Sequence, residues 1–76
     1  MASQRTHYTV IIKGHLGQRL QAAFAGLTCT AQPDGTTVIT GNLPDQAAAF
    51  GVLSTIERLG LTLISLQSKE EQSHVE

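Results

Sequence analysis

The 76-residue sequence is poor in aromatic residues and in cysteine: it has no Trp, one Tyr, two Phe and one Cys. A single cysteine excludes an internal disulfide, so the chain must be stabilised by its core or by self-association. The shortage of aromatic residues also argues against an RNA-recognition module, because such modules stack bases on aromatic side chains of a sheet. Among the expected strand residues, only Tyr8 could serve in that way.

The sequence also lacks an excess of charge and a long apolar run. Five Lys and Arg residues stand against six Asp and Glu, a formal net charge of −1, so no basic surface for nucleic acid is expected. No apolar stretch approaches the roughly 20 residues that cross a bilayer, and the N-terminus lacks the apolar region of a signal peptide. We expect one soluble, cytoplasmic domain with no nucleic-acid or membrane partner.

Along the chain, segments with a strand-like pattern alternate with segments that have a helix-like pattern. Strands are predicted at residues 7–13, 27–32, 36–40 and 61–66, where β-branched residues or a period of two dominate. Helices are predicted at residues 16–25 and from Pro44 and Asp45 to Leu59, where apolar residues recur every three or four positions. Pro33-Asp34-Gly35 is a turn between two of the strands, while Gly41-Asn42 is expected to end the third.

This order, β-α-β-β-α-β, predicts a ferredoxin-like α+β domain: a four-stranded antiparallel sheet with both helices on one face. The domain is expected to span residues 7–67. Residues 1–6 and 68–76 are polar or charged and are predicted to be disordered tails.

A sheet of this kind leaves one face without helices. Threonines mixed with a few aliphatic side chains are expected there, which is neither a charged surface nor a full core. The residues predicted to form an interface on this face are Thr9, Ile11, Thr28, Thr30, Ile39, Ile64 and Leu66. A second copy or another protein is expected to cover the face, since a small domain gains stability by burying such groups. The alternative is that these are scattered surface aliphatics of the ordinary kind.

Few residues suggest chemistry. The segment Lys13-Gly14-His15-Leu16-Gly17-Gln18-Arg19 places two glycines and two cations before a helix, but it lacks the spacing of a phosphate-binding loop. It also lacks the cysteine pair of a metallochaperone, and no metal site or cofactor is expected. Cys29 is interpreted as a buried, unreactive thiol. No nucleophile–base pair is visible, so a non-enzymatic protein is favoured.

The residues 37–48, with the run Gly41-Asn42-Leu43-Pro44-Asp45-Gln46-Ala47, and the residues 59–63 resemble a group of short single-domain bacterial proteins common in actinobacterial genomes. The resemblance implies a free-standing domain. It implies no activity, substrate or cofactor.

Two hypotheses follow. The first is a non-enzymatic homo-oligomeric module, most simply a homodimer through the open sheet face or an edge strand, with an interaction or regulatory role. The second is a small-molecule binder or small enzyme whose pocket forms at a dimer interface, with His7, Tyr8, His15 and Arg19 as polar groups at its rim.

Overall fold

The structure, a computed structural model, describes residues 5–71. Side chains are described for residues 6–69. The elements in chain order are β1 (Arg5–Lys13), α1 (Gln18–Gln21), the 3₁₀ turn η1 (Ala22–Phe24), β2 (Thr28–Ala31), β3 (Thr36–Leu43), α2 (Gln46–Arg58) and β4 (Leu63–Glu71).

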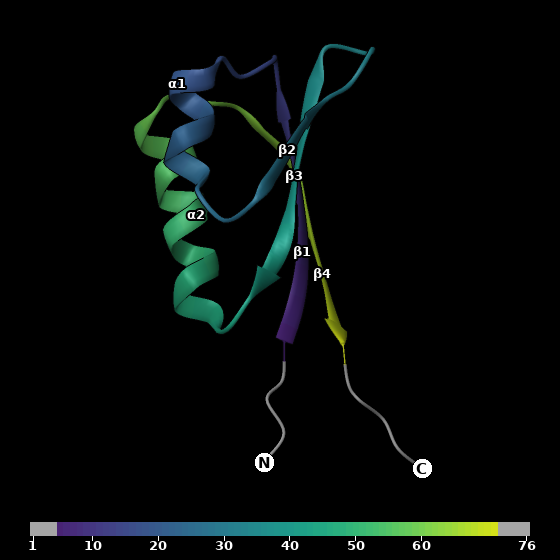
Figure 1. Ribbon diagram of the computed structural model, residues 1–76, viewed down its shortest axis with the longest axis vertical. Helices are drawn as coiled ribbons and strands as arrows, with labels where there is room; N and C mark the ends of the chain where they lie inside the picture. The colour runs from purple at the N-terminus through teal and green to yellow at the C-terminus, as the bar shows by residue number, and fades with distance from the viewer. Residues whose placement is uncertain (1–4, 72–76) are drawn as a thin grey trace.

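The strands form one sheet in the order β2-β3-β1-β4, and each neighbouring pair is antiparallel. Figure 1 shows α1 and α2 on the same side of this sheet, with the other side uncovered. The prediction of an α+β domain with a four-stranded antiparallel sheet and two helices is therefore confirmed. Strand β4 is one edge of the sheet and the much shorter β2 is the other.

The first helix is much shorter than predicted. Residues 16–25 were expected to be helical, but α1 has only four residues and continues as the three-residue turn η1. Gly17 lies at its N-cap in an extended conformation and offers no side chain to accept a hydrogen bond from the first turn. The segment is held instead by apolar side chains on either side of α1, Leu16 and Phe24, which are both buried.

Helix α2 is the principal helix, and its start is well defined. The Asp45 carboxylate accepts a hydrogen bond from the Ala48 amide at 2.9 Å and so caps the N-terminus. The helix begins at Gln46, so Pro44 and Asp45, which were predicted inside the first turn, precede it. Ala49 and Ile56 of α2 are buried against the sheet.

The core lies between the helices and one face of the sheet. Its buried apolar residues are Val10, Ile12, Leu16, Phe24, Ile39 and Ile56. Thr37 is buried among them, and its hydroxyl is satisfied by donating to the Gly14 carbonyl at 2.6 Å. That bond ties β3 to the loop that follows β1.

The outer ends of the sheet extend further than the sequence predicted. Arg5 pairs with Glu71 and Thr6 with Glu70, so residues 5–6 and 68–71 belong to β1 and β4 rather than to disordered tails. Backbone pairing between the two polar segments explains this, because ladder hydrogen bonds do not depend on apolar side chains. The rest of the predicted tails, residues 1–4 and 72–76, lies outside the described residues.

Strand β3 likewise continues through Gly41-Asn42, where a break was predicted. Gly41 pairs with Tyr8 of β1. A Cβ atom at Gly41 would clash with the Leu27 side chain, so this glycine makes room for packing within the sheet instead of ending the strand.

Candidate functional site

The uncovered face of the sheet is a regular polar surface, which we call the open face. Because directly paired residues of an antiparallel sheet point to the same side, the strand register defines its rows. The rows are Asn42-His7-Lys69, Thr28-Thr40-Thr9-Gln67 and Thr30-Val38-Ile11-Ser65. Ile11 and Val38 are the aliphatic members of these rows, and both are half-buried. These rows of the open face therefore present mainly polar side chains, five of which are hydroxyls.

Four of the seven residues predicted for this face lie on it: Thr9, Ile11, Thr28 and Thr30. The assignment of Ile39 was wrong. Ile39 pairs with Val10 and Cys29 and is only 1% exposed, so it belongs to the core. The alternation in β3 places Thr37 and Ile39 inward and Val38 outward. Hydropathy alone does not indicate this orientation, because it places a polar threonine in the core and a valine outside it.

The assignment of Leu66 to the open face was also wrong, and an irregularity in β4 explains why. Ile11 pairs with Ser65 but Ile12 pairs with Leu63, so Ile64 is an extra residue in the ladder. Because of this extra residue, the β4 side chains that follow Ile64 point to the opposite face of the sheet from the one that strict alternation predicts. Leu66 therefore pairs with Val10 and points to the helix side of the sheet. Ile64, at the bulge, is 52% exposed.

These residues reveal a different surface, along the outer edge of β4. The large apolar side chains that are most exposed in the described part of the chain are Phe50, Leu63, Ile64 and Leu66. Three lie on β4 and the fourth on α2. We call this set the apolar edge. It borders a nine-residue strand that, in the part of the chain that the structure describes, has the hydrogen-bonded neighbour β1 on one side and none on the other.

The position of Phe50 follows from the helix period. Ala48, Gly51 and Thr55 line a groove with the residues of η1 and Leu27, which marks the flank of α2 nearest β2. Phe50 is two positions from Ala48, one from Gly51 and five from Thr55, so at about 100° per residue it lies about 100–160° around the helix from each of them, on the opposite flank. That flank faces the β4 side of the sheet, and Phe50 is 60% exposed there.

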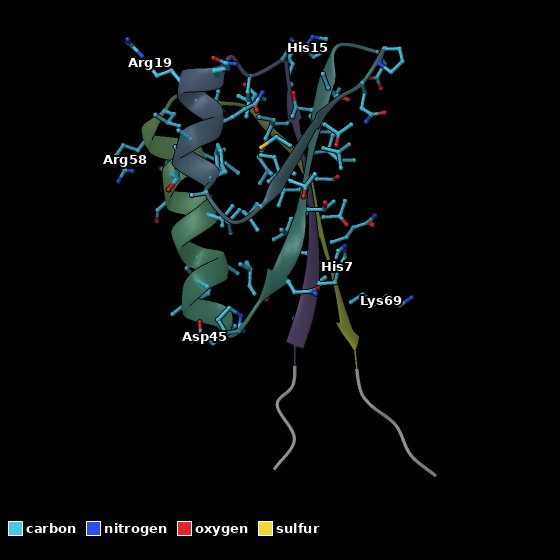
Figure 2. The ribbon with its side chains drawn as sticks, in the orientation of Figure 1. His7, His15, Arg19, Asp45, Arg58 and Lys69 are labelled. Carbon is cyan, nitrogen blue, oxygen red and sulfur yellow. The ribbon has the colours of Figure 1, made fainter. Side chains whose placement is uncertain are left out.

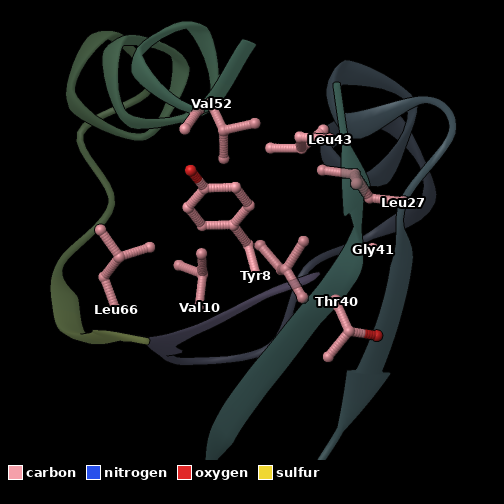
Figure 3. A pocket seen from close by; sticks show the side chains of 10 residues that line it. Tyr8, Val10, Leu27, Thr40, Gly41, Leu43, Val52 and Leu66 are labelled. Carbon is pink, nitrogen blue, oxygen red and sulfur yellow. The ribbon is translucent and has the colours of Figure 1, made fainter. Parts of the chain in front are cut away.

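Inside the apolar edge, a narrow crevice separates α2 from the sheet. Figure 3 shows the Tyr8 ring in this crevice, directed toward Val52 of α2, with Leu66 at one side. Its free volume is about 10 Å³, which is about the space of one water molecule. Leu66 of β4 and Ala49 of α2 both line this crevice, and Phe50 follows Ala49 in the helix.

The residues predicted to surround a ligand do not come together. Figure 2 shows His7 toward the terminal end of the sheet, whereas His15 and Arg19 lie near the opposite end. Tyr8 points to the helix side and His7 to the open face, as neighbours in a strand must.

Two of these residues have local structural partners. His7 Nδ1 lies 2.9 Å from the Asn42 side-chain oxygen across β1 and β3. His15 Nε2 lies 2.9 Å from the Gln32 carbonyl and connects the loop after β1 to the end of β2. Both contacts are consistent with a ring N–H that donates to an oxygen.

The open face does form one shallow groove beside β4, lined by His7, Thr9, Gln67, Ser68 and Lys69. Among the residues whose side chains are described, no group of three or more His, Cys, Asp or Glu residues is placed to hold a metal ion. Cys29 is half-buried against the core, and burial raises the pKa of its thiol. A thiol with a raised pKa is a poor nucleophile.

Comparison with protein families identifies the chain. A family described as a domain of unknown function (DUF8691) matches residues 7–67. The chain belongs to this family. Comparisons with curated proteins and with solved structures give no match. Within the described residues, no helix is long and apolar enough to cross a membrane.

The sequence contained one unused signal for the apolar edge. Phe50 lies off the apolar stripe of α2 formed by Ala49, Leu53 and Ile56, so the helix period already predicts that its ring is exposed. Leu63 pairs with Ile12 and so points to the helix side, as the predicted alternation requires, and it is exposed because it lies on an edge strand.

Proposed function

We propose that the protein is a non-enzymatic homo-oligomeric module that acts through protein interaction, as a regulatory or accessory subunit. The observation that carries this proposal is the apolar edge, in which four large apolar side chains are each at least 40% exposed beside an edge strand. Exposed apolar residues that gather in one patch mark interaction surfaces, whereas single ones do not.

The arrangement of the polar groups supports a role without catalysis. His7, His15 and Arg19 lie on separate parts of the fold, and the two histidines contact Asn42 and Gln32. A general base must lie within hydrogen-bond reach of its nucleophile, and these side chains have no such arrangement.

Light scattering behind a sizing column, over a concentration series of the full chain, tests the proposal. We expect the mass of two or more chains. The mass of one chain at every concentration would contradict it.

The shallow groove on the open face favours a second candidate, the binding of a small anionic molecule. His7 and Lys69 face one another across β1 and β4, with Thr9 and Gln67 in the next row. Isothermal titration with small carboxylates and phosphates tests this, with Lys69→Ala as the variant expected to lose binding. Binding that is equal in the two proteins would exclude the groove.

We further propose that the fold is a ferredoxin-like β-α-β-β-α-β arrangement. Support comes from the strand order β2-β3-β1-β4 and from one helical segment in each crossover. The departure is the first crossover, where α1 and η1 replace one continuous helix. We also propose that the protein is related to the short actinobacterial proteins. Its proposed location is the bacterial cytoplasm, where Cys29 would remain a thiol.

A further inference from the structure

We propose that β4 pairs antiparallel with β4 of a second copy, which continues the sheet across a two-fold axis close to Leu66. This inference rests on the proposed self-association and names its partner, its surface and its geometry. It is argued from the edge strand, from the side chains beside it and from the area available.

The backbone of β4 provides the first argument. Its inner edge pairs with β1 along the length of the strand, while its outer edge has no strand beside it among residues 5–71. The opposite edge, β2, has four residues and exposes Thr28, Thr30 and Ala31. Natural proteins protect sheet edges with short strands, charged side chains or bulges. Strand β4 is long and has a bulge at Ile64, but three of its four side chains along Leu63–Leu66 are apolar.

The side chains provide the second argument. Leu66 lines the crevice beneath α2 together with Ala49, the residue before Phe50, and both Leu66 and Phe50 are exposed. A two-fold axis at Leu66 places Leu66 against its copy and brings the two Phe50 rings toward one another over the joined strands. The charged residues at the end of β4, Lys69, Glu70 and Glu71, then lie at the outer ends of the paired segment.

The area and the charge provide the third argument. With the axis at Leu66, the part of β4 that pairs with its copy is the seven residues Leu63–Lys69, which extend about 24 Å, and a helix layer packed on a sheet is about 20 Å thick. The contact therefore buries about 480 Å² per copy, or about 950 Å² in total, which is the size of a weak, reversible interface. The formal net charge of −1 means that two copies repel one another little. A second copy is thus an adequate occupant of this edge.

Sedimentation of charge variants tests the surface. Phe50→Glu changes a side chain that is 60% exposed, so the domain is expected to fold, and circular dichroism checks this. The dimer dissociation constant should rise roughly tenfold or more. Ala31→Glu on the other edge and Thr40→Glu on the open face are the matched controls, and both should change it by less than about twofold.

Crosslinking tests the register. With Cys29→Ser as background, Gln67→Cys lies one residue from the axis, so the two Cα atoms are about 8 Å apart across the joined strands. A short bifunctional maleimide should join them. Thr30→Cys lies at the far edge of each sheet, about 34 Å from its copy, and should not crosslink.

The outcomes separate this inference from the function on which it rests. Loss of the dimer in Phe50→Glu alone, with crosslinking at Gln67→Cys, supports the β4 pairing. A dimer that survives Phe50→Glu but is lost in Thr40→Glu overturns it, because the open face would then be the interface and self-association would stand. A wild-type chain that is monomeric throughout overturns both.

Discussion

The two edge strands of the sheet differ in length and in the side chains that they expose. Strand β2 has four residues, and its exposed side chains are two threonines and an alanine. Strand β4 has nine residues, and three of its apolar side chains are at least 40% exposed. The β2 edge is typical of a terminated sheet, and the β4 edge is typical of one that continues in a partner. This difference is the reason why we propose the β4 edge as the interaction surface.

The largest loss of stability is expected for a substitution at the centre of the sheet, compared with one at the β4 edge. Ile39 is 1% exposed between Val10 and Cys29, whereas Leu66 is 40% exposed. Ile39→Ala should lower the free energy of unfolding by about 3 kcal/mol, and Leu66→Ala by about 1 kcal/mol, in dilute protein.

Urea denaturation at several protein concentrations measures both losses. The loss from Leu66→Ala should grow with concentration, since a partner that covers Leu66 adds to its burial. Equal losses for the two variants at the lowest concentration would contradict the comparison.

On the β2 side, the close approach of Leu27 to Gly41 should give the next largest effect. Gly41→Ala places a methyl group against the Leu27 side chain and should lower the free energy of unfolding by about 1–3 kcal/mol. Leu27→Ala added to Gly41→Ala should cost less than it does alone, because it removes the clash. Gly51→Ala on α2 is the control: no atom lies within 4 Å of its added Cβ, and a gain of about 0.5–1 kcal/mol is expected. A Gly41→Ala protein as stable as wild type would show that Leu27 moves freely.

The helix that supports the β4 edge depends on its N-cap. Asp45→Ala removes the carboxylate that accepts from the Ala48 amide and should lower the free energy of unfolding by about 1 kcal/mol. Asp45→Ser retains an acceptor at the cap and should lose only a few tenths of that amount. Thermal unfolding by circular dichroism compares the two variants. Equal losses would indicate that Asp45 acts through something other than the cap.

The sequence predicted most of the elements because their signals are local. Residues 7–13 and 36–40 are rich in β-branched side chains, and both became strands. The lengths were less predictable: Arg5, Thr6 and residues 68–71 are polar, and they join the sheet only because two distant segments pair. The continuation of these strands depends on pairing between segments far apart in the chain, so it cannot be predicted from a short stretch of sequence.

The candidate surface was harder to predict than the fold, because it depends on one irregularity. Strict alternation groups Ile64 and Leu66 on the same side of β4, and the predicted interface followed that grouping. The bulge at Ile64 separates them and turns Leu66 toward the helices. Phe50 was identifiable as exposed, but its position beside β4 required the placement of α2 on the sheet.

The smallest effect is expected at the turn that joins β2 to β3, and it depends on pH. The Asp34 carboxylate accepts from the Thr36 hydroxyl at 2.6 Å and from the Thr36 amide at 3.0 Å. These hydrogen bonds hold the pKa of Asp34 below its usual range, and the bond from the hydroxyl has the larger effect. A carboxyl with a lowered pKa stabilises the folded state above the pKa of the unfolded chain. That contribution is lost as the pH falls from about 4 downward.

Amide exchange and thermal unfolding from pH 7 to pH 2, with Asp34→Asn as the matched variant, measure this contribution. The difference in melting temperature between wild type and Asp34→Asn should be small, should be constant above about pH 5, and should shrink below about pH 4. Because the other carboxylates are common to both proteins, the difference isolates Asp34. Protection should fall first at the amides of β2, which this turn holds against β3, while the amides of β4 retain theirs. A loss that begins in β4 would mean that the long edge, and not the short one, is the weaker side of the sheet.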